Sequence, residues 1–189
     1  EDESGDSYSF MELPGGGYMI ALSDGMGSGS EAGEESRTVI ELLERFSELG
    51  FKRETALSLI NSALVMENDR ETFATLDICC IDLYTGRAEF IKNGAAATYV
   101  IRDGTAKAIK SSSLPMGMLK YFDTDRSEYR LKRDDILLML TDGAAEVIER
   151  GGSAKLLTAM MKDNRLKDPK DIASFVLDSL KEMSGYRVQ

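Results

Sequence analysis

The sequence predicts an α+β fold built on a mostly antiparallel sheet. Strand patterns open the chain, two helical patterns follow, and a strand-rich block then precedes a helical C-terminal part. Strands and helices that are grouped in this way are typical of α+β proteins, whereas parallel α/β folds alternate them along the chain. The 189 residues suggest a single domain that is long enough to bury a sizeable hydrophobic core.

The first part of the chain predicts a hairpin followed by two helices. Pro14–Gly17 is a turn signal between two alternating apolar segments. Ser28 and Glu31 have the spacing of a helix-capping box, and Gly50 supplies a stop signal after a run of helical period. The elements predicted here are strands at about 8–13 and 18–23 and helices at about 31–49 and 54–67.

The second part predicts further hairpins and then helices. Thr85-Gly86 and Asp103-Gly104 are hairpin turn signals, and residues 111–119 form a loop around Pro115. The predicted strands cover 72–84, 87–92, 98–102, 105–109, 121–131 and 136–141, and the predicted helices cover 144–150, 154–162 and 172–183.

Composition excludes several classes of function. A net charge of −10 argues against non-specific nucleic-acid binding, which needs a basic face. The longest apolar runs are too short to cross a bilayer, so we expect no membrane contact by this stretch. The sequence contains no His, which excludes a Ser-His-Asp triad. Adjacent Cys79 and Cys80 in a strand point to opposite faces, so we expect buried thiols in a reducing setting.

Two apolar strands end in the same hydroxyl-Asp-Gly sequence. One reaches Ser23-Asp24-Gly25 and the other reaches Thr141-Asp142-Gly143. A single Asp-Gly after a strand is most often an ordinary turn, because both residues favour turns. Two matched copies instead suggest two carboxylates aimed at one point, which is costly unless a cation lies between them. We therefore predict a site for a hard divalent metal ion, with Asp6 as a third carboxylate and the Gly25 carbonyl as a further oxygen ligand.

The glycines that follow Asp24 allow another interpretation. Gly25, Gly27 and Gly29 could cradle a phosphate with backbone N–H groups, although their spacing fits neither a P-loop nor a dinucleotide fingerprint. The acidic residues in the next helix favour a nearby cation over a bare phosphate. A metal site is therefore the preferred interpretation of this loop.

Taken in order, these motifs resemble the PP2C-type family of metal-dependent protein serine/threonine phosphatases, and most closely its bacterial branch that regulates sigma factors. The resemblance covers nearly the whole chain. It rests on the following segments: Gly5-Asp6, Asp24-Gly25-Met26-Gly27-Ser28-Gly29, Ala74-Thr75-Leu76, Asp82, Thr85-Gly86, Asn93-Gly94, Leu114-Pro115-Met116-Gly117 and Leu140-Thr141-Asp142-Gly143.

The resemblance implies an α-β-β-α sandwich of mostly antiparallel sheets flanked by helices. It also implies a binuclear Mn²⁺ or Mg²⁺ site held by Asp6, Asp24, Gly25 and Asp142, with Asp24 and Asp142 acting through metal-bound water. The implied reaction is direct attack of a metal-bridged hydroxide on a phosphoserine or phosphothreonine. The implied substrate is a phosphorylated anti-sigma-factor antagonist of sporulation control. The implied location is the cytoplasmic face, in a parent protein anchored in the cell membrane, with a homodimer as one option.

Two departures from the family pattern qualify the prediction. Ala95–Ala97 stand where many relatives carry a His, and the family's last metal-binding Asp and final strand would follow Gln189. Because the sequence also begins at Glu1, we expect residues 1–189 to be one phosphatase domain cut from a longer protein.

Two alternatives to this mechanism remain. An aspartyl-phosphate enzyme would need Asp-x-Asp, but Met26 and Ala144 occupy those positions, which makes it the weaker option. A non-catalytic or regulatory interaction domain on the same fold stays open.

Overall fold

A computed structural model of the chain describes residues 5–26, 30–66, 73–103, 105–150 and 168–184. The contacts divide the chain into two compact units. The first comprises residues 1–96 and 110–132, and the second comprises residues 97–109 and 133–189.

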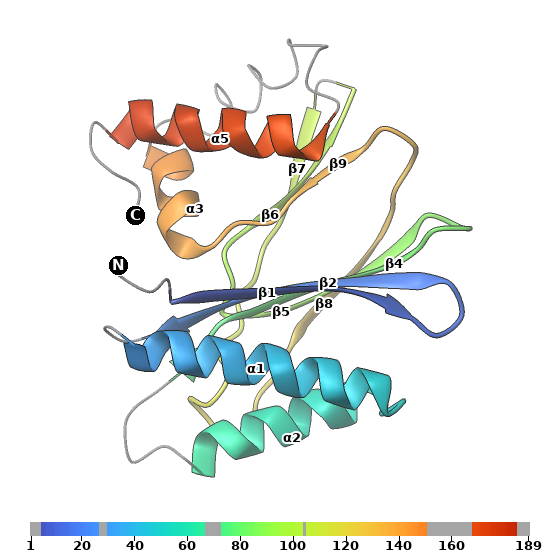
Figure 1. The fold of residues 1–189 in the computed structure, drawn as a ribbon, viewed down its shortest axis with the longest axis vertical. Coiled ribbons are helices and arrows are strands. Elements are labelled where there is room, and N and C mark those ends of the chain that lie inside the picture. Colours follow the sequence, from blue (N-terminus) through green and yellow to red (C-terminus); the bar gives the residue numbers. More distant parts are fainter. Residues whose placement is uncertain (1–4, 27–29, 67–72, 104, 151–167, 185–189) are drawn as a thin grey trace. The chain divides into compact units, whose positions relative to one another are not determined.

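The first unit is built on an antiparallel sheet (Figure 1) whose strand order is β1-β2-β4-β5-β8. Strand β3 pairs with the end of β2. Short turns set the register between neighbouring strands, so that Asp6 lies opposite Asp24 and Asp77 lies opposite Lys92. The strands are β1 (Asp6–Leu13), β2 (Gly17–Met26), β3 (Phe73–Ala74), β4 (Leu76–Asp82), β5 (Arg87–Asn93) and β8 (Asp125–Arg130).

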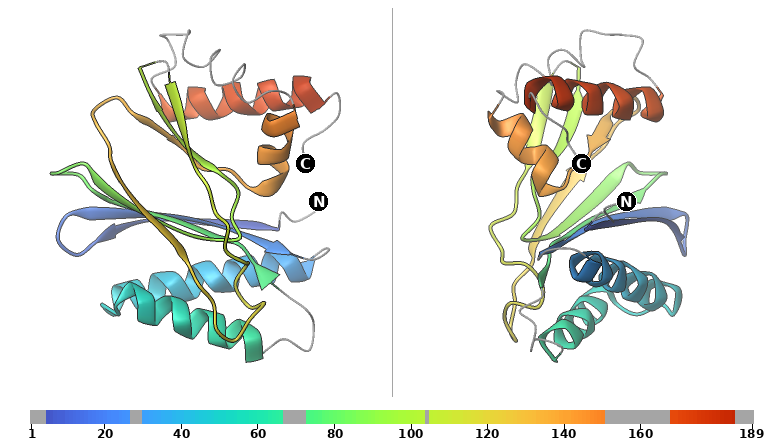
Figure 2. Two further views of the ribbon diagram at one scale, coloured as in Figure 1. Left: turned by 180° about the vertical axis from the view of Figure 1, so that it is seen from behind. Right: turned by 60° about the vertical axis from the view of Figure 1, so that its left-hand side comes forward.

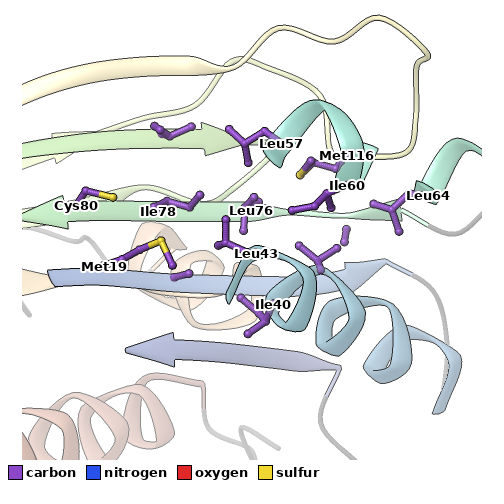
Figure 3. Packing of buried hydrophobic residues seen from close by; sticks show 14 residues of the cluster. Met19, Ile40, Leu43, Leu57, Ile60, Leu64, Leu76, Ile78, Cys80 and Met116 are labelled. Carbon is purple, nitrogen blue, oxygen red and sulfur yellow. The ribbon is translucent and has the colours of Figure 1, made fainter. Parts of the chain in front are cut away.

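Two helices, α1 (Ser30–Glu48) and α2 (Arg53–Met66), cover one face of this sheet (Figures 1 and 2). Alternate residues of β2 and β4 face the helices and form one hydrophobic core with them (Figure 3). Met116 contributes to this core from the loop that precedes β8. The most deeply buried members include Leu43, Leu57, Ile60, Leu76, Ile78 and Ile91.

The second unit contains a smaller antiparallel sheet in the order β7-β6-β9, together with α3 and α5. The Arg102 guanidinium donates to the Asp135 carboxylate, with Nε 2.7 Å from Oδ1, and ties the end of β6 to the start of β9. The elements are β6 (Thr98–Arg102), β7 (Thr105–Ile109), β9 (Ile136–Leu138), α3 (Asp142–Arg150) and α5 (Pro169–Ser184).

The α+β prediction with antiparallel sheets is confirmed, and three predicted boundaries were wrong. The strand predicted over 72–84 is interrupted at Thr75, whose side chain and backbone bond to Asp24. The strand predicted over 136–141 ends at Leu138, the last residue of β9 that pairs with β6. The strand predicted over 121–131 is confined to β8. The helix predicted over 154–162 lies outside the described residues.

Candidate metal centre

The structure places Asp6 and Asp24 side by side. They are directly opposed across the antiparallel β1–β2 pair. Directly opposed residues carry their side chains on the same face, with Cβ atoms about 5 Å apart. Two like charges so close destabilise the sheet unless a cation offsets them.

Asp24 is fixed by its other neighbour, Thr75. The Asp24 amide donates to the Thr75 hydroxyl at 3.1 Å, and the Thr75 amide donates to the Asp24 carbonyl at 2.8 Å. The buried Ser23 hydroxyl donates to the Thr75 carbonyl at 2.8 Å. The hydroxyl that precedes Asp24 in the sequence therefore supports the backbone that carries the carboxylate, and Asp24 is held from both sides.

Gly25 is required for close packing, which differs from the turn role that the sequence suggested. It lies inside β2, and its amide donates to the Gly5 carbonyl at 3.1 Å. A Cβ atom at Gly25 would lie 1.9 Å from the backbone oxygen of Ala32, in the first turn of α1. Only glycine lets α1 come this near to the residue that follows Asp24.

Asp142 has a different local structure from Asp24, although the sequence around the two is alike. It is the exposed first residue of α3, and the Ala145 amide donates to the Thr141 carbonyl at 3.0 Å. An Asp in the first turn suits the positive end of a helix dipole. A Cβ atom at Gly143 would meet nothing within 4 Å. Asp24 thus lies in a strand that is paired on both sides, whereas Asp142 opens a helix in the second unit.

Within the described residues, no three acidic or Cys side chains form a group that could hold a metal ion. The structure brings together Asp6 and Asp24, and Asp142 belongs to the other compact unit. The Asp6–Asp24 pair with the Gly25 carbonyl offers oxygen atoms only, which is the donor set that Mg²⁺ and Mn²⁺ prefer. The residues present therefore fit a hard divalent cation. Gly27–Gly29, on which the phosphate-cradle alternative rests, lie outside the described residues.

A buried ion pair that the sequence reasoning missed lies on the same sheet face. Leu22 and Asp24 share a face because they are two residues apart, and Leu22 is opposed by Asp77, which is in turn opposed by Lys92. The Lys92 ammonium lies 2.5 Å from the Asp77 carboxylate, and each side chain is at most 2% exposed. Burial lowers the pKa of Lys92, and the charge of Asp77 works in the opposite direction.

A serine-rich loop continues this row of charged residues into β8. Asp125 is opposed to Lys92, and its carboxylate accepts from the amides of Ser112 and Ser113 at 2.5 and 2.8 Å. These amide donors hold the pKa of Asp125 well below its ordinary value. The Ser113 hydroxyl also donates to the Lys92 carbonyl at 2.9 Å. The loop is therefore attached to the strand beside it.

The two cysteines behave as the sequence predicts. Both are buried and unbridged, and burial raises the pKa of each thiol. Thiols of raised pKa carry little thiolate at neutral pH and are inert as nucleophiles.

Among the described residues, no helix has the length and apolar character needed to span a membrane.

Comparison with solved structures identifies the class of protein. The chain superimposes on the PP2C phosphatase domain in a structure of stage II sporulation protein E from Bacillus subtilis that includes a fragment of the regulatory domain, with a TM-score of 0.81 and 34% identity, over 95% of this chain and 52% of that one. The fold is thus that of a PP2C-type serine/threonine phosphatase.

The family follows from sequence comparison. The model of the family described as "Stage II sporulation protein E (SpoIIE)" matches residues 14–189, and the chain belongs to that family. It is 35% identical to stage II sporulation protein E of Bacillus subtilis over 94% of this chain and 22% of the relative. It is 25% identical to phosphoserine phosphatase RsbP of the same organism, over 94% of this chain and 44% of that protein. The chain therefore spans less than half the length of either relative.

Proposed function

We propose that this chain is a catalytic domain that hydrolyses phosphoserine or phosphothreonine on a partner protein in a reaction that depends on divalent metal ions. The observation that carries the proposal is the opposed pair Asp6 and Asp24, two carboxylates on one face of the β1–β2 pair. The name of the relative RsbP, a phosphoserine phosphatase, supports the substrate class.

In this proposal Asp6, Asp24, the Gly25 carbonyl and Asp142 hold two Mn²⁺ or Mg²⁺ ions. When bound, such ions supply a water nucleophile of lowered pKa and offset charge on the transferred phosphoryl group. The protein itself holds the ligand residues in place. Thr75 and Ser23 hold the backbone of Asp24, and rigid strands keep catalytic geometry better than loops do.

The finer assignments belong to the same proposal. The partner protein is a phosphorylated anti-sigma-factor antagonist. Residues 1–189 are one phosphatase domain of a longer, membrane-anchored protein, and this domain lies on the cytoplasmic face of the membrane. A further Asp beyond Gln189 completes the metal ligands. A homodimer remains an option within this proposal.

The test is hydrolysis of a phosphoserine protein in a manganese titration, with this chain and with a version extended beyond Gln189. Asp24→Asn and Asp142→Asn should each remove nearly all metal-dependent turnover, because a neutral amide is a much poorer ligand than a carboxylate. Asp103→Asn removes one negative charge from an exposed hairpin turn and serves as the matched control.

Near-normal turnover in either site variant would contradict the proposed role of that residue. Absence of hydrolysis by both the chain and its extended version, together with absence of metal binding, would favour the interaction-domain alternative.

A further inference from the structure

One polar residue interrupts the buried stripe of α2. The residues of this helix that are buried against the core are Ala56, Leu57, Ile60, Asn61 and Leu64. Asn61 is only 1% exposed. Asn is a poor helix former, and a buried amide destabilises the fold unless both of its polar atoms find partners. An apolar residue at this position would pack in the core without needing hydrogen-bond partners, so the presence of Asn61 calls for a specific explanation.

Both ends of the Asn61 amide bond to the backbone of one loop, residues 116–119. The Gly117 amide donates to Asn61 Oδ1 at 2.9 Å, and Asn61 Nδ2 donates to the Leu119 carbonyl at 2.9 Å. Gly117 has a φ of +88°, a conformation that favours glycine. The side chain therefore fixes the path of the 116–119 loop at two points.

This loop in turn holds the short strand beside the metal centre. Met116 and Ala74 exchange two backbone hydrogen bonds, of 2.8 and 3.2 Å. Ala74 is the register partner of Gly25, and the next residue, Thr75, makes the bonds that fix Asp24. Strand β3 has only two residues, so its position depends on what flanks it. Gly25 lies on one side and Met116 on the other.

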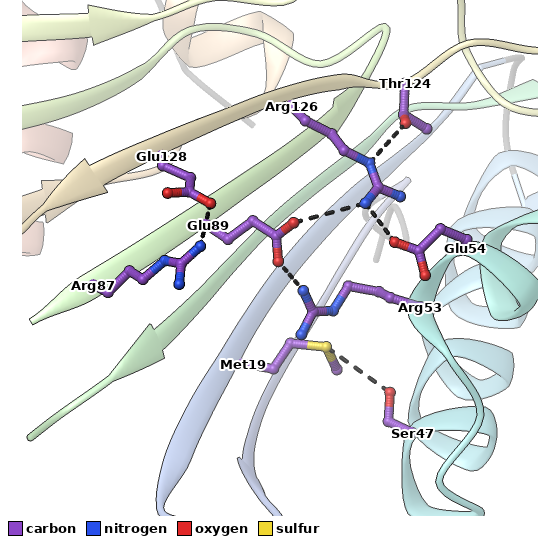
Figure 4. A network of polar contacts seen from close by, with 9 residues as sticks. All are labelled: Met19, Ser47, Arg53, Glu54, Arg87, Glu89, Thr124, Arg126 and Glu128. Atoms are coloured by element: carbon purple, nitrogen blue, oxygen red, sulfur yellow. Dashed lines mark hydrogen bonds and ion pairs between the residues drawn. The ribbon is translucent and has the colours of Figure 1, made fainter. Parts of the chain in front are cut away.

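The start of α2 is itself anchored to the sheet. Arg53 pairs with Glu89 on β5, while Arg126 on β8 pairs with Glu54 at 2.6 Å and approaches Glu89 at 3.7 Å (Figure 4). Met116 lies against Leu57 and Ile60 of the same helix (Figure 3). Asn61 therefore reaches the loop from a helix whose position is already fixed.

From this series of contacts we propose that Asn61 is a positioning residue for the metal centre. It holds the 116–119 loop, the loop holds β3, and β3 sets the backbone of Asp24 and Gly25. In this proposal Asn61 acts only through its bonds to Gly117 and Leu119 and is not itself a metal ligand. The inference rests on the proposed function for its catalytic meaning, but its structural part can be measured without any metal.

The experiment compares Asn61→Leu and Asn61→Ala with Ile40→Val. The Leu variant keeps the branching at Cγ, with two methyl groups in place of the amide oxygen and nitrogen, whereas the Ala variant leaves a cavity, and both lose the two amide hydrogen bonds. The control Ile40→Val removes one methylene group from the same core and leaves those bonds in place. Amide hydrogen exchange of the metal-free chains should show lost protection at Ala74, Thr75 and Met116 in both Asn61 variants, and not in the control.

A second readout is manganese affinity measured by calorimetry on the same chains. Loss of a residue that orients metal ligands typically weakens binding by about 10–100-fold, and we expect this in both Asn61 variants and not in Ile40→Val. If the Asn61 variants keep wild-type protection at Thr75, or lose protection evenly across the whole sheet, the proposal is wrong. Absence of phosphatase activity and of metal binding in both the wild-type chain and its version extended beyond Gln189 would refute the proposed function, and the exchange comparison would still decide the role of Asn61.

Discussion

Replacement of the glycine by alanine should have opposite effects on stability in the two Asp-Gly pairs, although the pairs look alike in the sequence. In Gly25→Ala the new methyl group would lie 1.9 Å from the Ala32 oxygen, whereas in Gly143→Ala it would meet nothing within 4 Å. The same chemical change is therefore a severe clash in one copy and is harmless in the other.

The expected change in the free energy of unfolding follows from these distances. Real Cβ atoms essentially never approach a neighbour closer than 3.0 Å, so α1 or β2 would have to move by about 1.1 Å at Gly25. Overpacking typically costs about 1–3 kcal/mol, and we expect about 3 kcal/mol here because the obstacle is backbone rather than a flexible side chain. Gly143 lies in α3, where Ala should stabilise the helix by up to about 1 kcal/mol.

The free energy of unfolding of both variants can be measured by urea denaturation, and manganese affinity by calorimetry. We expect Gly25→Ala to lose stability and to bind manganese more weakly, because the shift displaces the backbone next to Asp24. Gly143→Ala should match or exceed the wild-type stability. Equal stability of the two variants would show that the contact between Gly25 and Ala32 does not constrain α1, and the argument from close packing would fail.

The other predictions concern the charged row beside the candidate site. Lys92→Met should destabilise the fold by about 3–5 kcal/mol in urea denaturation, because it leaves Asp77 buried without its cation, and the double variant Lys92→Met, Asp77→Leu should recover most of that loss. A double variant as unstable as the single one would contradict this account of the ion pair. The depressed pKa of Asp125 means that its stabilising effect is present above its unfolded pKa of 3.8 and is lost as the pH falls toward its folded pKa. The unfolding free energy of the wild type should therefore fall more steeply between about pH 5 and about pH 3 than that of Asp125→Asn, and parallel curves would refute the role of the serine loop.

Much of the first unit could be predicted from the sequence, because its strands and helices follow clear apolar periods. The Pro14–Gly17 turn alone sets a register that brings Asp6 opposite Asp24. The likeness of the two Asp-Gly segments was misleading in one respect. Local sequence does not reveal that the pairing of β9 ends at Leu138 and that Asp142 starts a helix instead of ending a strand.

The residues that the sequence reasoning missed depend on contacts far apart in the chain. Asn61 bonds to residues 56 and 58 positions away, and no period or motif marks such a contact. The Asp77–Lys92 pair was missed partly because of register. A two-residue turn at Thr85-Gly86 would place Lys92 opposite Cys79, whereas the connection between β4 and β5 has four residues, 83–86, and places Lys92 opposite Asp77. Their burial also depends on tertiary packing that the turn does not encode.

The central claim is that Asp24 is a ligand in a divalent metal centre, and calorimetric titration of Mn²⁺ tests it most directly. The titration should be run on the chain and on its version extended beyond Gln189, each as wild type, as Asp24→Asn and as the control Asp103→Asn. The account predicts saturable manganese binding by the wild type and by Asp103→Asn, and its loss in Asp24→Asn. Binding of equal affinity and stoichiometry in all three proteins would contradict it.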